Sequence, residues 1–273
     1  PDAAADASGL GVIVGDQVLA DAHRARIAVG DHSLDVTIED PRPWPRRMFG
    51  GSSYFQMVPG LNQYWHPWLL GGRARGHVMI EGSRIELDGW QAYGEKNWGR
   101  GGFPDAWWWG QAQGFAERDA CVTFAGGIIS AGPRVAGRSW STEVTALVVA
   151  LPDGRVVRLG NPGTSPVQTR AGGGVWTLQG RSPRWQVELR GAVPEDEAFV
   201  LPVPLVEELR NTPGDLESLI GELRVRVREW GREVWTGETT LAALEVGGRE
   251  LAERVLADRG GDPRPVRRPG GAS

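Results

Sequence analysis

Apolar and polar residues alternate with a period of two in many short segments of this chain, and turn-forming residues separate the segments. Successive side chains of a strand point to opposite faces, whereas a helix repeats every 3.6 residues, so the pattern predicts strands. Alternation on both sides of Gly82-Ser83 predicts a hairpin over 76–88. Alternation around Asp153-Gly154 predicts another over 143–158.

The clearest alternation lies at 222–230, and residues 234–246 are its predicted hairpin partner. Leucine and valine occupy one face of 222–230, and arginine occupies the other, which favours one core face and one solvated face. The arginine row consists of Arg224, Arg226 and Arg228. Helix signals are few: one or two turns are predicted at 205–210, and a short helix at 249–257.

Regular short strands with glycine-rich turns predict an all-β fold, an antiparallel barrel or sandwich with few short helices. The 273 residues, 40 of them glycine, can hold one large β domain or two smaller barrels. We expect an N-terminal barrel part at 1–135 and a C-terminal barrel part at 136–257. Residues 258–273 are rich in glycine, proline and arginine, and we expect a disordered tail there.

Charge and cysteine content exclude several classes of function. A formal net charge of −4 supplies no broad positive field, so no nucleic acid partner is expected. Cys121 is the single cysteine, and with four scattered histidines it shows no zinc-ligand spacing, so no metal is expected. No apolar run is long enough to span a membrane, and no signal pattern is visible. We expect a soluble, cytoplasmic protein that can contact a membrane surface, of unknown oligomeric state.

The segment 106–115 is unlike ordinary core sequence. As a strand it would place two tryptophans and two glutamines on one face, namely Trp107, Trp109, Gln111 and Gln113. An apolar body with an oriented polar end is typical of a ligand cavity. The alternative is an aromatic core whose glutamine amides bond backbone groups.

The surrounding motif resembles the central signature of the tocopherol cyclase-like family. That signature reads Glu95-Lys-Asn-Trp-Gly99, then Phe103-Pro104, then Trp-x-Trp-x-Gln over 107–111. The stretches 57–66, 221–227 and 242–248 also resemble the family, so the similarity covers roughly residues 20–250. Family members open with an aromatic strand that is not visible before Gly9, and the chain begins with Pro1. We therefore expect an N-terminal segment to be missing.

The resemblance implies a lipocalin-like, two-barrel architecture similar to that of carotenoid hydratase-type proteins. It also implies an intramolecular cyclase that closes a chromanol ring on a prenylated hydroquinone or related isoprenoid. In this reaction an acidic group of the protein protonates a prenyl double bond, and a hydroquinone hydroxyl captures the resulting tertiary cation. No cofactor is therefore expected. This chemistry requires an acid kept protonated by desolvation, aromatic faces for the cation and exclusion of water.

Glu95 is the first candidate for the acid, and Asp105 is the second. The alternative for Glu95 is an ion pair with Lys96 or Arg100 at a strand end, because structural ion pairs also perturb carboxylates. The remaining candidates are expected to contact substrate: Asn97, Trp98, Tyr64 and His66. Asn97 is equally suited to shaping a turn, and His66 to a hydrogen bond within the fold.

Two other functions use the same features. A non-catalytic lipocalin-like carrier would bind a hydrophobic isoprenoid or lipid on the tryptophan face, and a hydratase would let water capture the cation. One barrel can host any of these roles, so fold alone does not separate them. The deciding feature is a carboxylic acid that points into the aromatic cavity.

Overall fold

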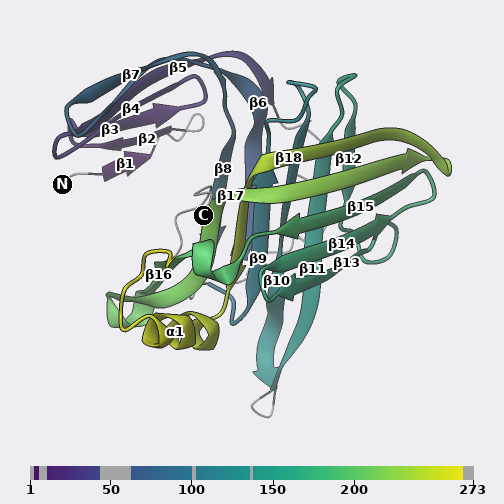
Figure 1. Ribbon diagram of the computed structural model, residues 1–273. Helices are drawn as coiled ribbons and strands as arrows, with labels where there is room; N and C mark the ends of the chain where they lie inside the picture. The colour runs from purple at the N-terminus through teal and green to yellow at the C-terminus, as the bar shows by residue number, and fades with distance from the viewer. Residues whose placement is uncertain (1–2, 6–10, 44–62, 100–102, 136–137, 267–273) are drawn as a thin grey trace. The chain divides into compact units, whose positions relative to one another are not determined.

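The computed structural model describes residues 3–5, 11–43, 63–99, 103–135 and 138–266, and it is built from two antiparallel sheets, which confirms the all-β prediction (Figure 1). The first sheet contains β1 (Ala3–Ala5), β2 (Gly11–Val14), β3 (Val18–Asp21), β4 (Arg24–Val29), β5 (His32–Pro43), β6 (Gln63–Ile80), β7 (Ser83–Gln91) and β8 (Gly94–Gly99). The second contains β9 (Trp107–Ala112), β10 (Cys121–Val135), β11 (Arg138–Ala150), β12 (Val156–Leu159), β13 (Val167–Gly172), β14 (Val175–Arg181), β15 (Trp185–Ala192), β16 (Phe199–Leu205), β17 (Arg210–Glu229) and β18 (Arg232–Gly247).

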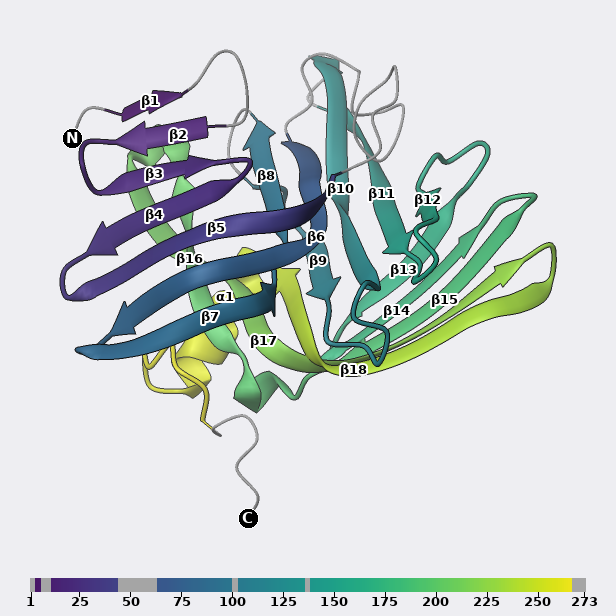
Figure 2. The ribbon, with the colours of Figure 1, turned by 90° about the horizontal axis from the view of Figure 1, so that it is seen from above.

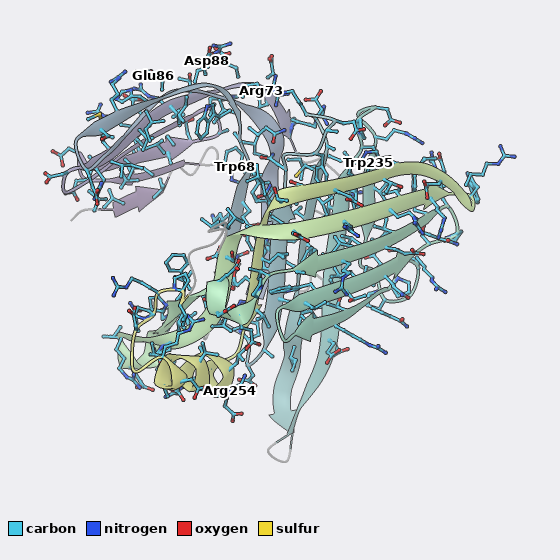
Figure 3. The ribbon with its side chains drawn as sticks, viewed as in Figure 1. Trp68, Arg73, Glu86, Asp88, Trp235 and Arg254 are labelled. Carbon is cyan, nitrogen blue, oxygen red and sulfur yellow. The ribbon has the colours of Figure 1, made fainter. Side chains whose placement is uncertain are left out.

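The first sheet is a meander in which β1 to β7 follow each other in chain order and β8 pairs with β6. The hairpin predicted over 76–88 is confirmed, because Ile80 of β6 pairs with Ser83 of β7 across the turn. Charged side chains lie on β7, where Glu86 and Asp88 are exposed (Figure 3). Buried apolar side chains of β5 and β6 include Val36, Leu69, Leu70 and Ala74.

The second sheet runs in the order β12-β11-β10-β9-β18-β17-β15-β14-β13, and β16 pairs with β17. It curves so far that β11 and β13 lie against one another, which brings its two ends together (Figure 2). The hairpin predicted over 143–158 is confirmed as β11 and β12, and the pair predicted at 222–246 as β17 and β18. A curved antiparallel sheet encloses one face, so alternate residues of each strand form the core.

The core of the second sheet is apolar and tightly filled. Among its fully buried side chains are Trp176, Phe124, Leu147, Leu178, Leu223 and Leu244. Gly110 of β9 lies against this core, and a Cβ there would overlap Phe124 and crowd Leu244. The face of β9 that carries residues 108, 110 and 112 therefore points inward, and the face that carries 107, 109 and 111 points away from this core.

Helical structure is sparse, as predicted. The helix α1 (Arg249–Asp258) follows β18 directly and packs against β16 and β17 through Ala252 and Val255, which are buried. A 3-10 turn at Val206–Glu208 occupies the site of the helix predicted at 205–210, and a second lies at Glu195–Glu197. Within the described residues, no helix combines the length and apolarity that crossing a membrane requires.

The chain divides into two compact units. One consists of Pro1–Pro45 with Pro67–Lys96, and the other of Arg46–His66 with Asn97–Ser273. The division predicted after residue 135 stays a prediction; β10 and β11, which it would separate, pair with each other and both lie in the second unit.

The predicted tail is described as far as residue 266, and residues 267–273 lie outside the described residues. The described part is hydrogen-bonded to the chain around β16. The Val200 amide donates to the Pro263 carbonyl at 2.8 Å, and the Val266 amide donates to the Asp196 carbonyl at 2.8 Å. Residues 259–266 thus run along β16 after α1 ends.

Candidate functional site

The tryptophan face of β9, defined by Trp107, Trp109 and Gln111, is the starting point of the candidate site. β9 pairs with β10 on one side and with β18 on the other, and this pairing fixes which of its side chains point to each face of the sheet. The three side chains share one face, as predicted from a strict period of two. Trp108 faces the core, where its indole N–H donates to Thr145 Oγ1 at 2.9 Å.

Trp107 is held in place by small and aromatic neighbours. Only 7% of Trp107 is exposed, and its ring centroid lies 4.9 Å from that of Phe103. Gly247 of β18 is its partner across the strand pair, and a Cβ at position 247 would overlap the indole. Because Gly247 has no side chain, the Trp107 ring can lie over the backbone of β18 at this position.

Glu245 lies on the same face, because it is the cross-strand partner of Trp109. The Trp107 indole N–H donates a hydrogen bond to the Glu245 carboxyl group. On the core side, the Trp176 indole N–H donates to the Glu245 backbone carbonyl at 3.0 Å. Two indoles thus fix both the side chain and the backbone of Glu245.

Asp215 of β17 completes a carboxyl pair with Glu245. Asp215 is the cross-strand partner of Gly247, so it lies diagonally across from Glu245, and the two side chains are hydrogen-bonded to each other. The backbone N–H of Leu201 also donates to Asp215. Asp215 is 6% exposed, and its Oδ1 is buried without a hydrogen-bond partner among the described residues.

Burial raises the pKa of both carboxyl groups. For Asp215, burial first and the nearby charge of Glu217 second raise the pKa to about 7, although the hydrogen bond from Glu245 opposes the shift. For Glu245, burial and then the charge of Asp215 raise the pKa well above its ordinary value, against the Trp107 hydrogen bond. The mutual hydrogen bond raises the pKa of Glu245 and lowers that of Asp215, so the pair favours keeping a proton.

Two further features lie on or beside the tryptophan face. Gln111 Nε2 is buried and has no hydrogen-bond partner within the described part of the chain. A pocket of about 840 Å³ lies beside Trp107 and Gly247. Its walls combine apolar residues, namely Phe103, Pro104, Val203, Leu205, Val206 and Leu251, with the charged residues Asp105, Glu208, Arg249 and Glu250.

The site residues predicted from sequence fall in different places. Asp105 is exposed and lines the pocket beside Trp107. Gln113 follows the end of β9, and its backbone carbonyl accepts a hydrogen bond from Thr239 Oγ1 at 2.7 Å. Glu95 belongs to the first unit, where the Tyr93 hydroxyl donates to its Oε2 at 2.6 Å.

The other predicted binding residues lie on β6 and β8. Asn97 is exposed on β8, and Trp98 follows it on the same strand. Tyr64 and His66 are half-buried on one face of β6, opposite the buried Trp65. Their contact with substrate stays a prediction.

Sequence reasoning missed Asp215 and Glu245 as acids. Asp215 follows the Thr212-Pro-Gly turn signal, and Glu245 stands between Leu244 and Val246, where alternation suggests an ordinary solvent-facing carboxylate. The one available signal was that Glu245 falls inside 242–248, a stretch that resembles the family. In the described part of the chain, no group of His, Cys, Asp and Glu side chains is arranged to hold a metal ion.

Comparison with known proteins places this geometry in context. A family model described as tocopherol cyclase-like matches residues 44–248, a range that includes Trp107, Asp215 and Glu245. No curated protein sequence matches. Similar solved structures include an AttH-type protein of Nitrosomonas europaea, with 12% identity, a TM-score of 0.40 and coverage of 88% of this chain and 67% of that one. Kievitone hydratase of Nectria haematococca has 13% identity, a TM-score of 0.44 and coverage of 88% and 71%.

Proposed function

This chain belongs to the tocopherol cyclase-like family, and we propose that it is an enzyme that closes a chromanol ring on a prenylated hydroquinone or a related isoprenoid phenol. The reaction begins with protonation of a prenyl double bond. A phenol hydroxyl then captures the tertiary cation, so the product is an isomer of the substrate. Atoms and electrons balance without an oxidant or reductant.

The buried carboxyl pair on the tryptophan face supports this proposal. Protonating an alkene requires a carboxylic acid that keeps its proton near neutral pH, and burial supplies that condition to Asp215 and Glu245. A surface carboxylate would be ionised and could not donate. The position of the pair beside two indoles matches the need of a developing cation for aromatic faces.

Gln111 suits the phenol end of such a substrate, and the pocket beside Trp107 suits its prenyl end. A buried amide N–H without a partner costs free energy, which a substrate oxygen would recover by accepting its hydrogen bond. The apolar walls of the pocket are suited to a prenyl chain, and its volume of about 840 Å³ falls within the usual size of small-molecule sites.

Incubation of the protein with 2-methyl-6-phytyl-1,4-benzoquinol tests the proposal. We expect a product of unchanged mass and altered retention, with the spectrum of a chromanol. Quenching of tryptophan fluorescence without turnover would instead indicate a carrier, and a product heavier by one water would indicate a hydratase. Either outcome would overturn the cyclase proposal.

Binding is tested separately from turnover. Replacing Trp107 or Trp109 with alanine should weaken both the fluorescence quenching and the affinity for the quinol, because each change removes an aromatic wall. Trp230, which is 69% exposed, supplies a matched control as Trp230→Ala. Unchanged affinity in folded Trp107→Ala and Trp109→Ala variants would remove the tryptophan face from the binding site.

A further inference from the structure

We propose that Glu245 and Asp215 act as one proton-cycling unit, in which Glu245 donates the proton that starts cyclisation and Asp215 recovers the proton that the phenol releases. This inference rests on the proposed cyclase function and assigns both proton transfers to a single carboxyl pair. Neither residue belongs to the aromatic motif that identified the site.

The donor is identified by its contacts. Glu245 is the cross-strand partner of Trp109, and its carboxyl group accepts the Trp107 indole N–H. Two aromatic side chains therefore border the acid, and the Trp176 bond to its backbone carbonyl fixes the strand at this residue. A proton leaving Glu245 would reach an alkene held against the same two indoles.

The acceptor is identified by its unsatisfied oxygen. Asp215 uses its other contacts to hold Glu245 and the Leu201 amide, whereas Oδ1 is buried without a partner among the described residues. A buried carboxylate oxygen without a donor is costly, and a phenol O–H would satisfy it. Glu217 on β17 is the neighbouring charged group, and its negative charge raises the pKa of both carboxyl groups.

The cycle balances. Glu245 O–H transfers its proton to the less substituted alkene carbon, whose π electrons form the new C–H bond, and leaves a tertiary cation beside two carboxylates. The phenol oxygen then forms the C–O bond, and its proton passes to Asp215. Transfer of that proton across the Asp215–Glu245 hydrogen bond restores the starting state, so no external acid is consumed.

Rates of chromanol formation by the full chain test the unit. Glu245→Gln should lower kcat about 10²- to 10⁴-fold, the usual effect of losing a general acid. Asp215→Asn should lower kcat about 10²-fold or more and should move the alkaline limb of the pH profile to lower pH, because Glu245 loses a negative neighbour. Glu238→Gln, the same change at an exposed position of β18, should leave kcat unaltered.

A second readout does not depend on turnover. Infrared spectra of the wild type should contain the carbonyl band of a protonated carboxyl group that persists above pH 7, where Asp215 is ionised, and Glu245→Gln should lose this component. If the wild type forms no chromanol, the cyclase function and this inference fall together. If the wild type cyclises while folded Glu245→Gln stays within about threefold of its rate, only the proton-cycling unit is overturned.

Discussion

The two halves of β17 differ in the surroundings of their charged side chains: one half forms ion pairs at the surface, and the other holds a carboxyl group away from solvent. The half after the register shift at residues 218–221 carries the arginine row, in which Arg224 and Arg226 are exposed and Arg228 is half-buried, paired with glutamates of β15 and β18. Arg228 lies 2.9 Å from Glu188, and Arg226 lies 3.2 Å from Glu233. The first half carries Asp215 against a second carboxyl group, away from solvent.

The charges of the exposed ion pairs cost little free energy, whereas the carboxyl charges in the first half cost more because they lie away from water. Exposed ion pairs typically contribute about 0–1 kcal/mol, and their loss is tolerated because water replaces the partner. Asp215 is buried and Glu245 is half-buried, and two like charges so close together and away from water do not both ionise easily. One strand thus carries a row of solvated ion pairs and, nearer its start, a carboxyl group whose pKa is raised by burial.

The largest effect on stability is expected from Asp215→Asn. The folded pKa of about 7 exceeds the ordinary 3.8, so the folded state binds a proton more tightly than the unfolded state between these values. Stability therefore falls as pH rises from about 4 to about 7, and the penalty at neutral pH is as much as about 4 kcal/mol. Asp215→Asn should remove that penalty.

Urea unfolding of the wild type and Asp215→Asn at pH 4 and pH 7 measures this difference. The gain in unfolding free energy should be present at pH 7 and nearly absent at pH 4. An equal difference at both pH values would show that Asp215 titrates normally and that the two halves of β17 do not differ in the way described.

A smaller effect is expected from Gly247→Ala. The added methyl group would overlap the Trp107 indole, and overpacking of this kind typically costs about 1–3 kcal/mol. Because Trp107 donates to Glu245, its displacement should also slow chromanol formation. Thermal unfolding and kcat measure the two consequences.

Gly163→Ala provides the matched control, since a Cβ at position 163 meets nothing within 4 Å. Its melting temperature and kcat should stay at wild-type values. Equal behaviour of Gly247→Ala and Gly163→Ala would mean that the sheet does not hold Trp107 through Gly247.

The smallest effect is expected in the solvated half of β17. Arg226→Gln removes the exposed ion pairs with Glu233 and Glu188 and should change the unfolding free energy by less than about 1 kcal/mol. The change should shrink further in high salt, because screening weakens exposed pairs. Unfolding in low and high salt measures it, and a large salt-independent loss would show that the arginine row is structural after all.

Much of the fold was predictable because strand alternation is local. The hairpins at 76–88 and 143–158, the two faces of 222–230 and the helix after 248 all follow from neighbouring residues and turn chemistry. The two compact units could not be found in this way, because they depend on which strands contact one another.

The site was predictable in its aromatic half for the same reason. Placing Trp107, Trp109 and Gln111 on one face requires only that 107–112 be a strand. The candidate acids were not predictable from sequence. A carboxylate that is near the tryptophan motif in sequence, such as Glu95, need not lie beside the tryptophan face after folding, whereas one far along the chain can. No local signal distinguishes Glu245 from the solvated Glu238 on the same strand.

The sequence by itself determined the strands, the faces of each strand and membership of the tocopherol cyclase-like family, since these depend on residue types at fixed short spacing. Only the tertiary structure decided that the side chains of Asp215 and Glu245 are hydrogen-bonded to each other beside Trp107. The pairing of β9 with β18 and of β18 with β17 joins residues up to 138 positions apart. Burial then shifts their pKa values, because the cost of a charge depends on the solvent and neighbours that folding leaves around it.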